Sequence, residues 1–172
     1  MKNIELVMKY GWVMMGIIST NTTPAYVYTV GFGVNPRFQG YDYVVVGMPA
    51  SLAAATMAAA TIDALYRNYL IPGIKITNDY VINEIANVPV IAKVLPKDLP
   101  CFGMGITVSN ILREMVGMTP TEDYPMIQLC WPDKNGKYCW EPDYIKYNIS
   151  HRSQKLMTHN WNDEENSAKE EN

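Results

Sequence analysis

Hydrophobic positions along the chain follow the two-residue period of strands in some stretches and the longer period of helices in others. WVMMGII (12–18) and AYVYTVGFG (25–33) are rich in β-branched and aromatic residues, and the polar stretch TNTTP separates them. This arrangement predicts two antiparallel strands. The next run, YDYVVVGM (41–48), is apolar at successive positions, which is typical of a central strand buried on both faces.

Two later stretches predict helices. Pro49 suits the first turn of a helix, and apolar residues then recur at three- and four-residue steps up to residue 69. GITVSNILREMVGM (105–118) predicts a second helix that ends near Gly117. Between them, IKITNDYVINEI (74–85) and VPVIAKVL (88–95) indicate further strands.

The order of these elements favours a single α+β domain over residues 1–150, with a mainly antiparallel sheet, two main helices and a C-terminal hairpin. The hairpin would join YPMIQLCW (124–131) to KYCWEP (137–142). We expect the helices to cover one face or one end of the sheet, which leaves the other face for function. Residues 151–172 are polar and acidic, and we expect them to form a disordered tail.

Charge argues against some partners. The net charge of the 172 residues is −3, and the last eleven residues hold five acidic residues against one lysine. The rest of the chain is close to neutral, so we expect no DNA binding. The charge-free run 43–62 has the length of a membrane span, but Gly47 and Pro49 interrupt it. We therefore expect no membrane segment, and we see no secretion signal, so the protein is expected in the cytoplasm.

Few residues suit catalysis or metal binding. The two histidines, His151 and His159, lie in the predicted tail, and the three cysteines, Cys101, Cys130 and Cys139, lack the spacing of metal ligands. CFGMGITVSN (101–110) places glycines before a helix, a weak signal for anion binding. We therefore expect no catalytic residue of the His-dependent kind, no metal and no cofactor.

The hairpin has two possible registers. A four-residue loop at 133–136 would place Cys130 opposite Cys139, whereas a two-residue Asn135-Gly136 turn would place Trp131 opposite Trp140. Only the first register would allow a disulfide, which a cytoplasmic setting disfavours. We expect free thiols.

Several quoted motifs resemble one family. YTVGF (28–32), YVVVGMPASLAAA (43–55), VPVIAKVL and above all PMIQLCWPDKNGKYCWEP (125–142) are similar to the bacterial and phage family catalogued as domain of unknown function 4262, over residues 5–145. The resemblance implies a shared fold and hardly any function. The chain departs from it by lacking a His-Pro pair before residue 43, and by having Cys139 where a proline is usual.

Aromatic residues on the predicted strands suggest a ring-lined pocket for a flat anionic ligand. The leading hypothesis is a non-enzymatic protein that binds a nucleotide-type small molecule; in one version a phage protein sequesters a host defence signal in the host cytoplasm. The expected lining is Tyr28, Thr29, Asn35, Arg37, Trp131 and Trp140.

Two other classes remain open. Exposed aromatic and Met residues would also suit a protein-protein interaction module, either a homo-oligomer or an inhibitor of a partner. The third class is an enzyme that uses two carboxylates, Asp133 with Glu141.

Overall fold

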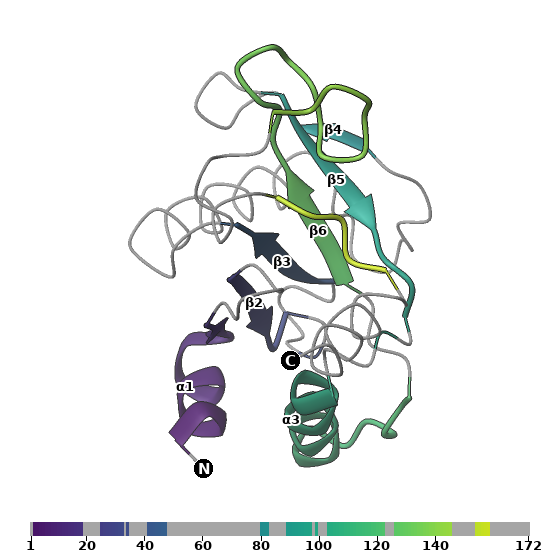
Figure 1. Ribbon diagram of the computed structural model, residues 1–172. Helices are drawn as coiled ribbons and strands as arrows, with labels where there is room; N and C mark the ends of the chain where they lie inside the picture. The colour runs from purple at the N-terminus through teal and green to yellow at the C-terminus, as the bar shows by residue number, and fades with distance from the viewer. Residues whose placement is uncertain are drawn as a thin grey trace, which may run out of the picture.

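A computed structural model gives the fold of the chain (Figure 1). It describes residues 2–18, 25–32, 34, 41–47, 80–82, 89–97, 99, 103–122, 126–145 and 154–158. The predicted helix over 49–69 and the predicted strand residues before Tyr80 lie outside these ranges. Among the described residues, none of the helices has the length and apolar character needed to cross a membrane.

The described residues form a six-stranded sheet with the strand order β1-β2-β3-β6-β5-β4. Its neighbours are antiparallel except for β3 and β6, which are parallel. The α+β class with a mainly antiparallel sheet is therefore confirmed. The strands are β1 (Val13–Ile17), β2 (Tyr26–Val30), β3 (Asp42–Val46), β4 (Tyr80–Ile82), β5 (Val90–Val94) and β6 (Met126–Cys130).

The middle of the sheet is buried on both faces. Every residue of β2, β3 and β6 is buried, as the consecutive apolar positions of YDYVVVGM predict for a central strand. The register also agrees with the predicted pairing of the first two strands, since Met15 lies opposite Tyr28. The side chains of these three strands therefore form part of the protein core.

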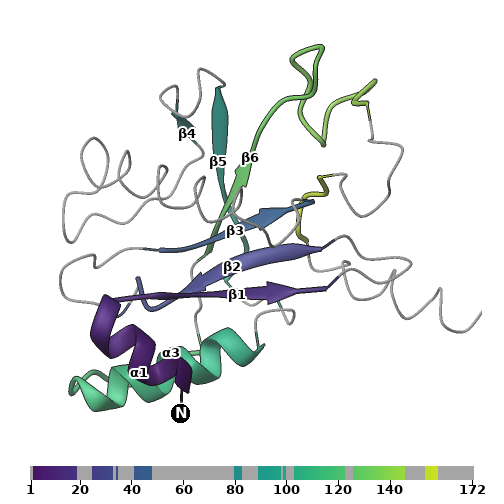
Figure 2. The same ribbon diagram turned by 90° about the vertical axis from the view of Figure 1, so that its left-hand side faces the viewer.

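Two helices, α1 (Lys2–Tyr10) and α3 (Gly103–Met115), pack on one face of the sheet (Figures 1 and 2). Val7 of α1 and Leu112 of α3 join the same hydrophobic core as Tyr28 and Val44. Gly31 allows α1 to lie this close: its φ is +115°, and a Cβ there would stand 2.7 Å from Cγ1 of Val7.

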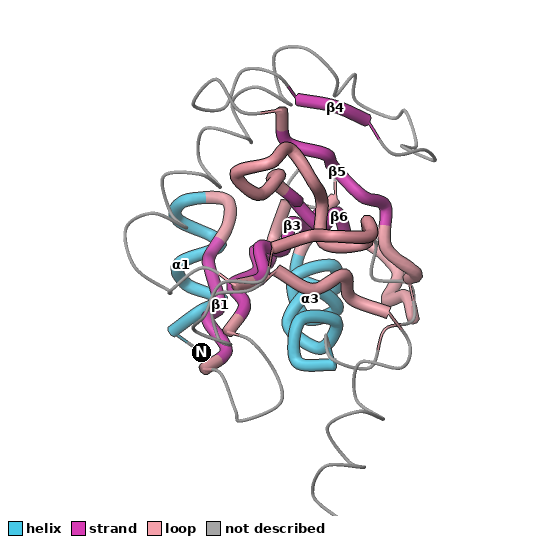
Figure 3. Tube along the Cα trace, turned by 45° about the horizontal axis from the view of Figure 1, so that its top comes forward, coloured by secondary structure: helices cyan, strands magenta, loops and turns pink. Residues whose placement is uncertain are grey.

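Of the predicted C-terminal hairpin, the structure forms the first strand. β6 forms as expected, but residues 131–145 fold into successive turns without a second strand (Figure 3). The turns bring this segment, called here the 131–145 loop, back toward β5, where Tyr138 Oη donates a 2.8 Å hydrogen bond to the Pro89 carbonyl. Two prolines and the Asp133 side chain interrupt the alternation that a strand would need.

Part of the predicted tail is packed. Residues 154–158 cross β6, and Gln154 and Met157 are only 4% and 1% exposed (Figure 1). The side-chain amide of Gln128, on β6, makes two hydrogen bonds to the backbone of this segment. Its Nε2 donates to the Lys155 carbonyl at 2.8 Å, and its Oε1 accepts from the Met157 N–H at 2.9 Å. The expected boundary at residue 150 therefore does not mark the end of the packed chain.

Candidate functional site

The structure describes four of the six predicted lining residues, and two of them, Tyr28 and Thr29, are buried. Tyr28 is 2% exposed and belongs to the hydrophobic core. It lies in one cross-strand row with Val44, Gln128 and Lys93. Three strand spacings, roughly 14 Å, separate Tyr28 from Lys93. Tyr28 is a core residue, and Asn35 and Arg37 lie outside the described residues.

Thr29 also has a structural role. Its side chain is buried, and the hydroxyl donates to Asp42 Oδ1 at 2.9 Å and accepts from Tyr43 N–H at 2.8 Å. Asp42 is itself 1% exposed and also accepts the Phe32 N–H at 3.2 Å. A buried carboxylate needs such partners, so the Thr29 hydroxyl stabilises the junction of β2 and β3.

The Trp131 backbone fixes the start of the 131–145 loop. Gln154 Oε1 accepts from Trp131 N–H at 3.0 Å, and Gln154 Nε2 donates to the Trp131 carbonyl at 2.7 Å. This two-bond clamp joins the end of β6 to the packed C-terminal segment. The contacts that hold Trp131 are therefore hydrogen bonds to its backbone N–H and carbonyl groups.

Trp140, in contrast, lies at the surface with 37% of its area exposed. Its ring stacks on that of Tyr138, with centroids 5.1 Å apart and planes 12° from parallel. The Nζ of Lys93, on β5, lies 4.7 Å from the centroid of the Trp140 ring. These three residues, called here the Trp140 stack, combine exposed aromatic surface with a positive charge.

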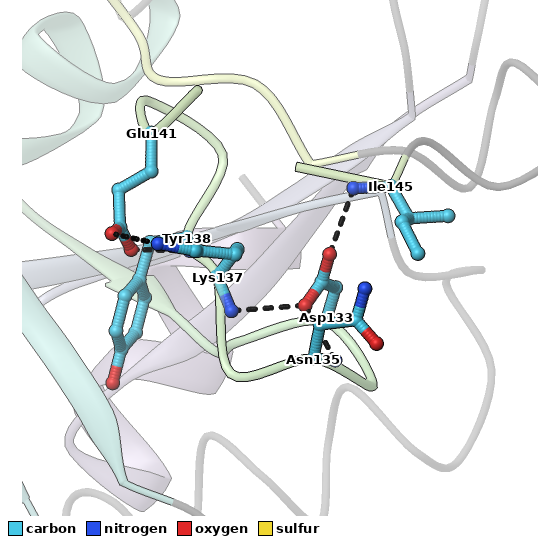
Figure 4. A network of polar contacts seen from close by, with 6 residues as sticks. All are labelled: Asp133, Asn135, Lys137, Tyr138, Glu141 and Ile145. Atoms are coloured by element: carbon cyan, nitrogen blue, oxygen red, sulfur yellow. Dashed lines mark hydrogen bonds and ion pairs between the residues drawn. The ribbon is translucent and has the colours of Figure 1, made fainter. Parts of the chain in front are cut away.

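Asp133 holds the loop that presents the Trp140 stack (Figure 4). Its Oδ1 accepts N–H hydrogen bonds from Asn135 at 2.8 Å and from Lys137 at 2.9 Å, and its Oδ2 accepts one from Ile145 at 2.8 Å. Desolvation raises the pKa of Asp133, but these hydrogen bonds and the Lys134 charge outweigh it, so the pKa lies below 3.8.

Glu141 has a similar role beside Tyr138 (Figure 4). Its Oε2 accepts the Tyr138 N–H at 2.8 Å, and its Oε1 lies 3.5 Å from Lys137 Nζ. Desolvation and the Glu141 charge raise the pKa of the Tyr138 hydroxyl. Since Asp133 and Glu141 both bind loop backbone, their geometry is that of loop anchors and does not favour the carboxylate-enzyme hypothesis.

Two cysteines belong to this region, Cys130 at the end of β6 and Cys139 in the 131–145 loop. Cys130 is buried and Cys139 is partly exposed, and neither forms a disulfide. The Cys130 side chain hydrogen-bonds that of Cys139 and lowers the pKa of the Cys139 thiol; burial opposes this effect and the Lys93 charge supports it. The cysteines are neighbours, as the four-residue register predicted, but turns rather than a strand ladder bring them together.

Sequence reasoning missed Lys93 and Tyr138 as partners of Trp140. Lys93 is the single charged residue within the apolar stretch VPVIAKVL, and this interruption was an available signal. Its pairing with Trp140 depends on the backward turn of the loop, which no short motif specifies. Among the described residues, no group of three or more His, Cys, Asp or Glu could hold a metal ion.

Comparison with known proteins places the chain in a family. Neither the curated proteins nor the solved structures include a match. The model of one family matches residues 6–145, which contain the whole described sheet and the 131–145 loop. The chain therefore belongs to the family described as domain of unknown function (DUF4262).

Proposed function

We propose that the protein binds a planar, anionic small molecule of the nucleotide type at the Trp140 stack, without chemical conversion. The observation that carries this proposal is the exposed Trp140 ring with Lys93 Nζ 4.7 Å from its centroid. An aromatic ring stacks on a base with about 1–3 kcal/mol per base, and a lysine adds attraction for phosphate. Sequestration of a signalling nucleotide is the form of this function that we favour.

The loop geometry supports this use. Asp133 accepts the Lys137 N–H and Glu141 accepts the Tyr138 N–H, so the backbone that carries the Tyr138 ring is held in place before a ligand arrives. Pre-ordering reduces the entropy that binding must remove. The near-neutral body of the protein supplies no broad attraction for polyanions, so the charge that matters is local.

Thermal unfolding with a panel of mono-, di- and cyclic nucleotides tests the proposal. A ligand at 100 times its Kd stabilises the native state by about 2.7 kcal/mol, so a binder raises Tm measurably. We expect Trp140→Leu and Lys93→Gln to remove the shift. Recovery of the nucleotide intact after denaturation would agree with binding without conversion.

Lys9→Gln is the matched control. Lys9 Nζ lies 5.0 Å from the ring centroid of Tyr10, which makes a second exposed lysine-aromatic pair on α1. This variant makes the same change of charge away from the 131–145 loop and should keep the full Tm shift. Absence of a shift with every nucleotide, or an undiminished shift in Trp140→Leu, would refute the proposal.

A second candidate function, self-association, rests on β1. This strand is at one edge of the described sheet, and Ile17 and the following Ile18 are 36% and 87% exposed. An edge strand with apolar side chains can pair with the same strand of another copy. Light scattering across a concentration series tests this: Ile18→Lys should reduce the mass of any oligomer, and a wild-type monomer at every concentration would exclude it.

A further inference from the structure

We propose that Cys139 and Cys130 form a reversible, peroxide-responsive dithiol site, in which Cys139 reacts first and Cys130 resolves the product as an intramolecular disulfide. The inference concerns the chemistry of this pair and holds whether or not the Trp140 stack binds a nucleotide.

Contacts on both sides of Cys139 fix its place. Tyr138 bonds to Pro89, just before β5, and Trp140 contacts Lys93 within β5. Cys139 is therefore held at the level between these two positions. Ile91 occupies this level on β5, and its register partner on β6 is Cys130. The sheet register and the loop contacts thus place Cys139 next to Cys130.

The two thiols differ in solvent exposure, and this difference agrees with the proposed order of reaction. Cys139 is partly exposed and can meet a peroxide, whereas Cys130 is completely buried, with Sγ 4.0 Å from the Gln128 carbonyl oxygen. The lowered pKa of Cys139 and the nearby Lys93 favour its thiolate, which is the reactive form. Cys130 lies at the end of a buried strand, and Cys139 lies in a turn that can adjust toward the geometry of a disulfide.

The chemistry balances with a hydroperoxide as oxidant. The Cys139 thiolate attacks one peroxide oxygen, the O–O bond breaks, and the departing oxygen takes a proton to leave as water or an alcohol. Cys139 is then a sulfenic acid. Cys130 Sγ attacks the Cys139 sulfur, the S–O bond breaks, and the hydroxyl group leaves as water with the Cys130 proton. The two thiols lose two electrons in total, and the peroxide gains them.

Peptide mapping after peroxide treatment tests the proposal. The full-length protein is treated with hydrogen peroxide, its remaining thiols are alkylated, and it is digested without reductant for mass spectrometry. We expect the protein to lose two of its three titratable thiols and to yield a peptide pair cross-linked through Cys130 and Cys139. Dithiothreitol should break the cross-link and restore both thiols. Cys101→Ser, the matched control, should keep this cross-link.

The variants separate the two roles. In Cys130→Ala we expect Cys139 to form a sulfenic acid, which dimedone traps, and we expect no cross-link. Cys130→Ser should give the same result and replaces Cys130→Ala if that variant folds poorly. In Cys139→Ser we expect Cys130 to stay reduced because it is buried. An unchanged thiol count, a sulfinic acid at Cys139 beside an alkylated Cys130 in the wild type, or a cross-link through Cys101 or between two chains would overturn the proposal.

Discussion

At the scale of single residues, the 131–145 loop depends on the Asp133 carboxylate. Folding lowers the pKa of this group, so its stabilising contribution is complete above the unfolded value near 3.8 and is lost as pH falls through the folded value. We expect Asp133→Asn to lower Tm at neutral pH, and the difference from wild type to shrink below pH 3.8. Thermal unfolding from pH 2 to 7 measures this difference.

Asp143→Asn is the control for Asp133→Asn. Asp143 lies in the same loop with an exposed side chain, and its positive φ of 66° is one that asparagine tolerates well. The same chemical change there should leave Tm nearly unchanged. If Asp133→Asn lowered Tm by the same amount at every pH, the proposed role of the Asp133 charge would be contradicted.

Thr29 offers a second residue-scale prediction. Thr29→Val preserves the shape of the side chain but removes the hydroxyl that bonds to Asp42 and Tyr43. We expect a loss of about 1–3 kcal/mol in unfolding free energy, because buried polar groups lose a partner. Urea unfolding measures it. Thr107→Val, an exposed site on α3, is the matched control and should change stability by less than about 0.5 kcal/mol.

The same residues show what a sequence reveals about a site. Tyr28 and Thr29 follow a strand pattern, and the pattern indicates that they alternate between faces but not that both faces of β2 are buried. Trp140 is a candidate because it is an aromatic residue within a predicted strand. Its neighbour Lys93 is 47 positions earlier in the chain, and only the fold brings the two together.

At the scale of elements, backbone hydrogen bonds around Gly117 end helix α3. Met118 N–H donates to the Arg113 carbonyl and Gly117 N–H to that of Glu114, the pattern of a Schellman cap, with Gly117 at φ +77°. We expect Gly117→Ala to cost about 1–2 kcal/mol, since a Cβ disfavours this φ although the space is open. Chemical unfolding measures the loss.

Gly103→Ala provides the comparison for Gly117→Ala. Gly103 begins α3, a Cβ there would also meet open space, and its φ is outside the left-handed region. This variant should change stability by less than about 0.5 kcal/mol. Equal losses in the two variants would mean that the cap geometry is not the cause.

Elements with a strong local pattern were predictable, and those held by side chains were not. The pairing of β1 with β2 and the end of α3 at Gly117 agree with expectation, since β-branched runs and a glycine cap are local signals. The missing second strand of the hairpin is different. Asp133 accepts three backbone N–H groups there and thereby favours turns over a ladder.

At the scale of the whole molecule, residues 154–158 complete the fold although charge and polarity marked this region as tail. The segment covers Gln128 and clamps Trp131, so it connects the centre of the sheet to the base of the 131–145 loop. The side chains of Gln128 and Gln154 each make two hydrogen bonds to backbone groups of the other segment, as a neighbouring strand would. The polar composition of residues 151–172 does not indicate such long-range pairing.

Truncation tests this role at the same scale. A chain that ends at residue 153 loses the buried Met157 side chain and the hydrogen-bond partners of Gln128 and Trp131, whereas a chain that ends at residue 158 keeps them. We expect the shorter chain to have a much lower Tm and the longer one to match wild type. Met157→Ala in the full chain should cost about 2–5 kcal/mol, the usual range for a buried methionine. If both truncated chains unfolded at the wild-type Tm, the packing of this segment on β6 would contribute nothing to stability.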